Sequence, residues 1–203
     1  MRPHCRHPGL AYGTEAVPEA PELLTPRLLL RHWHPDDLAP FAAMNADPEV
    51  MEHFPALMSR AESDAFTARV ETELMSLGYG LWAVQERATG RFLGFTGMHP
   101  VTFEAPFVTG TTVEIGWRLR REGWGRGYAQ EAARAALEVA FGAAGLREVV
   151  SFTSTTNHRS TRVMEGIGMT HDPADDFDHP RLPRGHRLER HVLYRISSPP
   201  TST

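Results

Sequence analysis

Cysteine is almost absent from this chain, since the 203 residues contain one, Cys5. A single thiol cannot form an intrachain disulfide, and it supplies no cysteine cluster for a metal. This usage is typical of a reducing compartment, and we expect a cytoplasmic location. Cys5 lies in a polar N-terminal stretch, so the sequence offers no good nucleophile for covalent catalysis.

The sequence also lacks long runs of basic or apolar residues. It has 21 Lys and Arg against 25 Asp and Glu, a formal net charge of -4, which is not the electrostatic pattern of a nucleic-acid-binding protein. No apolar run approaches the length of a membrane span. The N-terminus begins with basic residues but no apolar segment follows them, so we expect no signal peptide. Neither nucleic acid nor membrane is therefore an expected partner.

The composition that remains is that of one globular domain with polar ends. Hydrophobic residues make up 41% of the chain, and 203 residues are enough to bury a core. Residues 1–22 are rich in Pro, Ala, Gly and Glu, and residues 197–203 in Ser, Thr and Pro. Such composition buries little apolar surface, so we predict a mobile arm and a mobile tail around a domain spanning residues 23–196.

Hydrophobic periodicity predicts a sheet with interspersed helices. Strands are predicted over 27–33, 81–87, 91–101, 111–119, 146–154 and 190–196, with a further short strand near Met169. Helices are predicted over 34–46 (with His34 or Asp36 as N-cap), from about 59 to 77, 128–141 and 157–168. The fold class is therefore α/β or α+β, with helices on both faces of the sheet.

Glycines are concentrated just before one of these helices, in the stretch REGWGRGYAQEA, residues 121–132. Two interpretations compete: a surface turn that needs positive φ angles, or a loop whose backbone binds an anion at the helix N-terminus. The stretch lies directly between a predicted strand and a predicted helix, which favours phosphate binding. No Gly-Lys-Ser/Thr follows, so it is not a P-loop.

These segments together resemble a known family. VEIGWRL (113–119), WGRGYAQEA (124–132) and TSTTNHRSTRVMEGIGM (153–169) are similar in sequence and order to the GNAT superfamily of acyl-CoA-dependent N-acetyltransferases. The opening LLTPRLLLRHWHPDD (23–37) is most similar to the branch of RimJ- and RimL-type protein N-terminal acetyltransferases. The resemblance covers nearly all of residues 23–196.

The resemblance implies a central, mostly antiparallel mixed sheet that splays around an acyl-CoA cleft between two neighbouring parallel strands. It implies acetyl-CoA as co-substrate and no metal. The glycines would let backbone amides contact the two phosphates of coenzyme A. The cofactor-binding residues that it implies are Trp117, Leu119, Trp124, Gly125, Arg126, Gly127, Tyr128, Ala129 and Asn157.

Two residues are candidates for the chemistry of acetyl transfer, in which an amine loses a proton and a thiolate leaves. Glu114 is the one acid in an otherwise apolar strand; alternation alone would make it a solvent-facing carboxylate, but the resemblance makes it the general base, directly or through water. Many relatives have a tyrosine acid where this chain has Met164. Either Ser160 assists the leaving thiolate, as the resemblance implies, or water does.

Other polar residues have weaker assignments. Asn157 is also a suitable N-cap for the helix that follows, and Arg159 and Arg162 face either a phosphate or solvent. Histidines and aspartates gather in residues 171–191, but their spacing matches no metal motif, so no metal site is predicted. In this family the loop 172–186 borders the acceptor site, and its acidic half would attract a cationic substrate.

The sequence therefore predicts an acetyl-CoA-dependent N-acetyltransferase. The acceptor amine is either a protein N-terminus or a small molecule, and the protein is either a monomer or a homodimer. The alternative is a module that binds acyl-CoA without turnover. The carboxylate of Glu114 argues against that alternative, since a binding module needs no base.

Overall fold

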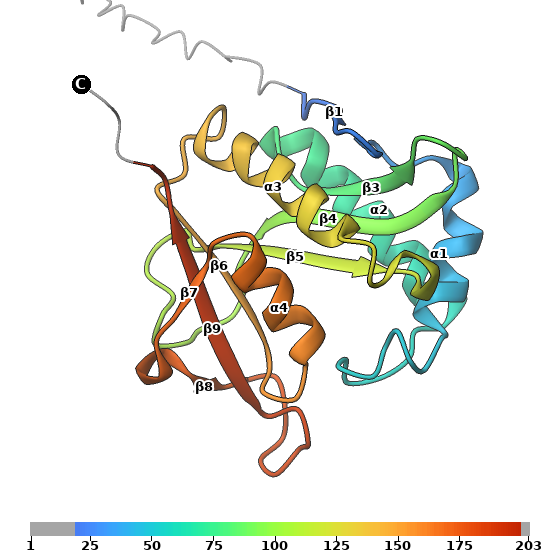
Figure 1. The fold of residues 1–203 in the computed structure, drawn as a ribbon. Helices are drawn as coiled ribbons and strands as arrows, with labels where there is room; N and C mark the ends of the chain where they lie inside the picture. Colours follow the sequence, from blue (N-terminus) through green and yellow to red (C-terminus); the bar gives the residue numbers. More distant parts are fainter. Residues whose placement is uncertain (1–18, 200–203) are drawn as a thin grey trace, which may run out of the picture.

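The computed structural model describes residues 19–199, and Figure 1 shows a single mixed sheet with helices on both of its faces. The sheet has nine strands, eight of them in the order β1-β2-β3-β4-β5-β6-β9-β7, with β8 paired to β9. The strands are β1 (Leu23–Leu24), β2 (Leu28–Arg31), β3 (Leu81–Glu86), β4 (Phe92–Pro100), β5 (Val113–Leu119), β6 (Glu148–Ser154), β7 (Thr170–His171), β8 (Phe177–Asp178) and β9 (Arg190–Ser197). The helices are α1 (Leu38–Asn45), α2 (Arg60–Leu77), α3 (Tyr128–Phe141) and α4 (His158–Gly166).

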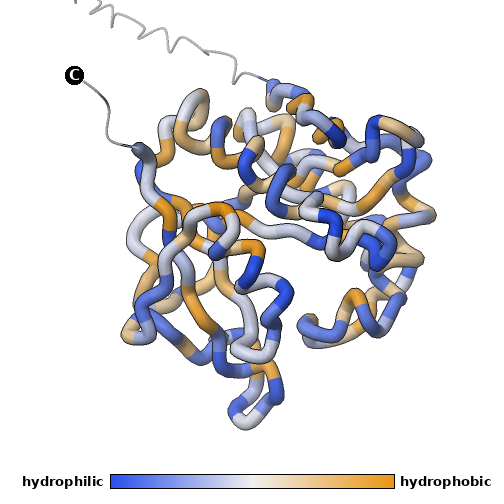
Figure 2. Tube along the Cα trace, in the orientation of Figure 1, coloured by the Kyte–Doolittle hydropathy of each residue, from blue (hydrophilic) through white to orange (hydrophobic). Residues whose placement is uncertain are grey.

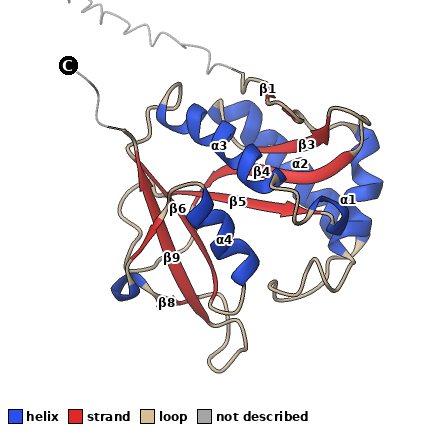
Figure 3. Ribbon diagram, viewed as in Figure 1, coloured by secondary structure: helices blue, strands red, loops and turns tan. Residues whose placement is uncertain are grey.

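The sheet opens between its two parallel strands, β5 and β6. Their pairing is confined to one register position, Glu114 opposite Val150. The antiparallel pairs on either side, β4–β5 and β6–β9, are by contrast hydrogen-bonded along the strands. Figure 3 shows the two strands diverging, with α4 beside the gap. This confirms the predicted fold class, a mostly antiparallel mixed sheet with a V-shaped opening.

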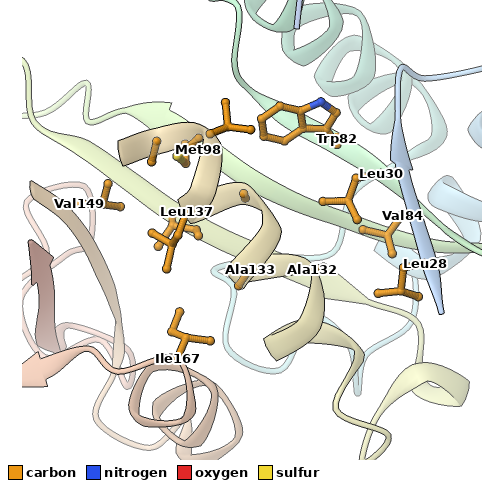
Figure 4. Packing of buried hydrophobic residues seen from close by; sticks show 14 of the residues in the cluster. Leu28, Leu30, Trp82, Val84, Met98, Ala132, Ala133, Leu137, Val149 and Ile167 are labelled. Atoms are coloured by element: carbon orange, nitrogen blue, oxygen red, sulfur yellow. The ribbon is translucent and has the colours of Figure 1, made fainter. Parts of the chain in front are cut away.

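Helix α3 packs against the sheet through alanines. Ala132, Ala133, Ala136 and Ala140 are fully buried, and they share one core with apolar side chains of β2–β5 and α4. Figure 4 shows Ala132 and Ala133 facing this core beside Leu137. Alanine has a high helix propensity and no bulk, so it lets the helix axis lie close to the strands. The short connection from β5, which ends at Leu119, to α3, which begins at Tyr128, places the N-terminus of the helix near the end of the strand.

The opposite face of the sheet is covered by α1 and α2 over a second, aromatic core that includes Trp33, Phe41 and Phe95. Helix α2 begins with a capping box between Ser59 and Glu62. In Figure 2 hydrophobic and hydrophilic stretches alternate along the helices, as expected for elements with one buried face. Helices on both faces of the sheet were predicted from the sequence and are confirmed.

The ends of the domain differ from the prediction. Within the predicted arm 1–22, two residues contact the domain: Ala20 is buried, and the Pro21 carbonyl accepts a hydrogen bond from Trp82 Nε1 at 2.9 Å. At the other end β9 continues to Ser197, one residue beyond the predicted boundary. The reason is tertiary packing, which composition does not report. The rest of the predicted arm and tail, 1–18 and 200–203, lies outside the described residues.

Three strands of the sheet, β1, β7 and β8, are only two residues long. Strands β1 and β8 were not predicted because two-residue strands carry no periodic signal. The predicted short strand near Met169 is present as β7. None of the helices within residues 19–199 combines the length and the apolar character that a bilayer span needs.

Candidate active site

A cleft of about 760 Å³ follows the opening between β5 and β6. Its walls come from β5, β6, the N-termini of α3 and α4, and the segment that joins α1 to α2, residues 46–59. Of the predicted site residues, all but Arg126 line it. They are Glu114, Trp117, Leu119, Trp124, Gly125, Gly127, Tyr128, Ala129, Asn157 and Ser160. Elements far apart in the sequence thus meet around one space.

One end of the cleft is formed by the backbone of residues 124–129, which we call the phosphate loop. Gly125 and Gly127 have φ angles of 70° and 76°, a region that favours glycine. Within residues 19–199 the N–H groups of residues 125–129 have no acceptor in the protein. They lie at the N-terminus of α3, where the helix dipole adds a partial positive charge. The loop therefore has the chemistry of an anion site.

The phosphate loop is held from behind by side chains. Arg27 Nη1 donates to the Arg126 carbonyl at 2.9 Å, and Arg27 is itself bound by Glu131 at 2.6 Å. The Tyr128 hydroxyl donates to Glu86 Oε1 at 2.7 Å, and Arg126 Nη1 lies 3.7 Å from the same oxygen. The side chains of Arg126 and Tyr128 therefore bind Glu86, and the loop presents backbone to the cleft.

Glu114 lies at the point where β5 and β6 separate. Its carboxylate is 3.3 Å from His99 Nε2, because His99 on β4 is its cross-strand neighbour on the same face. Burial alone lowers the pKa of His99, but the carboxylate of Glu114 favours the imidazolium, and the net result is a raised pKa. His99 carries no signal in the sequence, because its position opposite Glu114 depends on the register between β4 and β5.

The N-terminus of α4 forms another wall. Asn157 caps the helix, since its side chain accepts from the Ser160 N–H at 3.2 Å, and its amide donates to Thr153 Oγ1 at 2.9 Å. Ser160 lines the cleft, one turn before Met164. The Met164 side chain is fully buried in the core with α3, away from the cleft. A larger side chain at that position would have to displace core atoms.

The segment 46–59 supplies further polar contacts that sequence reasoning missed. His53 Nδ1 lies 3.3 Å from Ser154 Oγ on β6, and burial lowers its pKa. Glu52 pairs with Arg159 of α4 at 2.9 Å. Arg159 also stacks 4.1 Å from the centre of the Trp124 ring. The segment therefore spans from the α1–α2 side of the cleft to its α4 side.

Arg118, on β5, is the most buried cation of the cleft. It is 8% exposed and its Nη1 donates to Asn45 Oδ1 at 2.7 Å. Burial lowers its pKa to about 10, so it stays charged at neutral pH. The alternation of β5 places it on the same face as Glu114.

The acids of the C-terminal loop do not face the cleft. Asp175 pairs with Arg195, Asp176 with His171, and Asp178 with Arg190. The parts of the loop that line the cleft are instead His179, Arg181, Leu182 and Leu188. The expected acidic attraction for a cationic substrate is therefore not supplied by these carboxylates. They pair instead with side chains of β9 and β7.

Burial lowers the pKa of two histidines beside this loop, His179 and His191, and so favours their neutral forms. The rings of His179 and His191 lie in a tilted arrangement with their centres 4.9 Å apart, and the pKa of His191 is lowered to about 4. Across the part of the chain that the structure describes, three or more His, Cys, Asp or Glu side chains nowhere gather as a metal site would require.

The sequence of this chain is similar to that of known acetyltransferases. Residues 27–170 match the acetyltransferase (GNAT) domain profile. The uncharacterised protein YkkB of Bacillus subtilis is 34% identical over 149 residues, which cover 73% of this chain and 84% of the relative. The FsC-acetyl coenzyme A-N(2)-transacetylase of Aspergillus fumigatus is 39% identical over 136 residues, 63% of this chain, and the match spans 56% of its length.

Solved structures agree on the fold. A GNAT-family acetyltransferase from Bacillus anthracis superposes with a TM-score of 0.71 at 24% identity, covering 87% of this chain and 98% of that one. The ribosomal L7/L12 α-N-protein acetyltransferase RimL, solved with coenzyme A, gives 0.65 at 13% identity over 91% and 98%. The chain belongs to the GNAT acetyltransferase family, whose members are acyl-CoA-dependent transferases.

Proposed function

We propose that this protein transfers an acetyl group from acetyl-CoA directly to a primary amine. One observation carries the proposal: Gly125, Gly127, Tyr128 and Ala129, whose backbone N–H groups have no acceptor within residues 19–199, line the same cleft as the carboxylate of Glu114. The amides suit a pyrophosphate, and the carboxylate suits removal of a proton from an amine.

The residues of the cleft fit acetyl-CoA as co-substrate. Backbone amides from Gly125 to Ala129 would hold the pyrophosphate, and the positive φ angles of the two glycines make those amides converge. Trp117 and Leu119 of β5, Trp124 and the Asn157 amide would contact the rest of the cofactor. The cofactor supplies an activated thioester. No covalent bond to the protein is needed.

The reaction requires two proton movements at this site. Glu114, paired with His99, takes the proton from the attacking amine, either directly or through a water molecule. The amine nitrogen bonds to the acetyl carbon as the carbon–sulfur bond breaks. The Ser160 hydroxyl at the start of α4 would donate a hydrogen bond to the departing sulfur, with the proton coming from water. Met164 is buried in the core and takes no part.

The proposal also covers the acceptor amine, the cellular location and the oligomeric state. The acceptor is either a protein N-terminal amine, as in the RimJ- and RimL-type branch, or a small-molecule amine. The fungal relative is named as an N(2)-transacetylase, which supports the second. A cytoplasmic location is supported by the single cysteine, and we expect a monomer or a homodimer.

The test is a screen of amines and peptides with acetyl-CoA, reading free thiol release. Each positive acceptor is then analysed by mass spectrometry for one added acetyl group. Thiol release that depends on both enzyme and acceptor, with acetylated product, supports the proposal. Tight binding of acetyl-CoA without product on any amine would contradict it.

A further inference from the structure

The guanidinium of Arg118 is buried in the cleft, and residues 19–199 supply no anionic partner for it. Its Nη1 donates to the neutral Asn45 amide and contacts the Met58 sulfur at 3.7 Å. Nε is buried and has no acceptor. Among residues 19–199 no carboxylate forms an ion pair with this arginine, in contrast to the other buried arginine of the fold, Arg31, which pairs with Asp37 at 2.7 Å.

Aromatic rings surround the group in place of carboxylates. The guanidinium carbon lies 3.9 Å from the centre of the Phe54 ring and 5.4 Å from that of Phe95. Phe66 is at 5.9 Å. These rings offset part of the cost of burying a charge, but they accept no hydrogen bonds in the plane of the guanidinium. Within residues 19–199 neither Nε nor Nη2 has a hydrogen-bond acceptor, and the edge that these two atoms form matches a carboxylate in shape.

Arg118 lies on the same strand as Glu114, the residue proposed to take the proton from the amine. Arg118 and Glu114 are on one face of β5, four residues apart, so their Cα atoms are separated by about 13 Å. Between them lies Gly116, where a Cβ would meet no atom within 4 Å. The floor of the cleft is therefore open from the proposed base to the buried cation.

We infer that the acceptor carries a carboxylate as well as its amine, and that Arg118 binds this carboxylate while Glu114 faces the amine. The inference rests on the proposed transfer to an amine and specifies its substrate class. The spacing requires several bonds between the two groups, as in a long-chain amino acid or a peptide with an acidic side chain. An amine adjacent to its own carboxylate is too short.

The experiment compares two acceptors that differ in charge alone, 6-aminohexanoate and its amide, 6-aminohexanamide. With the parent enzyme, kcat/KM for the acid should exceed that for the amide by about 10- to 100-fold, as expected for a charge-assisted bidentate pair. In Arg118→Met, which keeps the volume and removes the charge, the ratio should fall to about one, mainly through KM. Arg118→Lys should recover part of the ratio.

Arg69→Met is the matched control, because Arg69 also lines the cleft but pairs with Glu73 at 2.9 Å. It should leave the ratio unchanged. Melting temperature and acetyl-CoA affinity are measured for each variant, so a folding defect is seen separately. Turnover of both acceptors at equal rates, or a ratio that Arg118→Met leaves intact, overturns the inference while the transferase proposal stands. Turnover of no amine overturns the transferase proposal itself.

Discussion

The two ends of the cleft are built in different ways. The phosphate loop is continuous in sequence, and it presents backbone amides positioned by two glycines and a helix N-terminus. The acceptor end combines side chains from β4, β5, α2 and the segment 46–59, such as His99, Glu114, Arg118 and Phe54. On the proposed function, the first end would bind any acyl-CoA, while the second would select the acceptor amine.

Because the two ends differ, mutations can separate the binding of acetyl-CoA from the transfer of its acetyl group. A change in the phosphate loop should alter the affinity for acetyl-CoA and little else. A change at the acceptor end should alter turnover or acceptor choice with the affinity for acetyl-CoA nearly constant. Variants that fail to separate in this way would show that the two ends act as one unit.

The largest expected effect is at the base. Glu114→Gln keeps the shape and removes the proton acceptor, so kcat should fall by about 100-fold or more with acetyl-CoA affinity little changed. The loss should be greater for a lysine-like amine, with a pKa of about 10.4, than for an α-amine near 8. Steady-state kinetics with calorimetry measures both. Glu138→Gln, at an exposed position, is the control, and parental turnover in Glu114→Gln would remove Glu114 from the mechanism.

At the other end, Gly125→Ala should weaken acetyl-CoA binding by about tenfold or more, because Gly125 has a left-handed φ that strains alanine, and it lines the cleft where the phosphates are proposed to bind. Gly90→Ala is a close control: Gly90 has the same φ of 70°, it also has open space around it, and it lies in the β3–β4 turn. Both variants should lose similar stability. Equal acetyl-CoA affinities by calorimetry would contradict the role of the loop.

A smaller effect on kcat is expected at the start of α4. Here one residue caps the helix and another is proposed to assist catalysis. Asn157, not Ser160, provides the cap. Ser160→Ala should therefore lower kcat by about tenfold at an unchanged melting temperature. Asn157→Ala should lower the free energy of unfolding by about 1 kcal/mol. A fall in melting temperature for Ser160→Ala with kcat intact would assign Ser160 a structural role.

The smallest effect concerns pH. The pKa of His191 is lowered to about 4 in the fold against 6.5 for the free side chain, so the unfolded chain binds the proton first. Stability from this site is present above about pH 6.5 and is lost progressively as the pH falls towards 4. His191→Gln should flatten that part of the curve in urea titrations. A curve identical to the parent's would show that His191 is not the group responsible.

Features that depend on neighbouring residues in the chain could be predicted from the sequence, whereas contacts between distant segments could not. The phosphate loop and α3 were predicted because glycine spacing and alanine periodicity are local signals. The pairing of His99 with Glu114 depends on the register of β4 and β5, and the surroundings of Arg118 depend on α2 and on residues 54 and 58. Side-chain contacts over such separations carry no periodic signal. The acids of the C-terminal loop were misassigned for the same reason, since their partners are on β9 and β7.

The central claim is that backbone amides of residues 125–129 bind acetyl-CoA. Hydrogen–deuterium exchange with and without acetyl-CoA tests it directly, since these N–H groups have no acceptor within the described protein and should exchange rapidly in its absence. We predict that acetyl-CoA slows exchange most strongly in the peptide covering 124–130, with no change in the turn at Gly90. Saturating acetyl-CoA that leaves exchange in residues 124–130 unaltered would contradict the account.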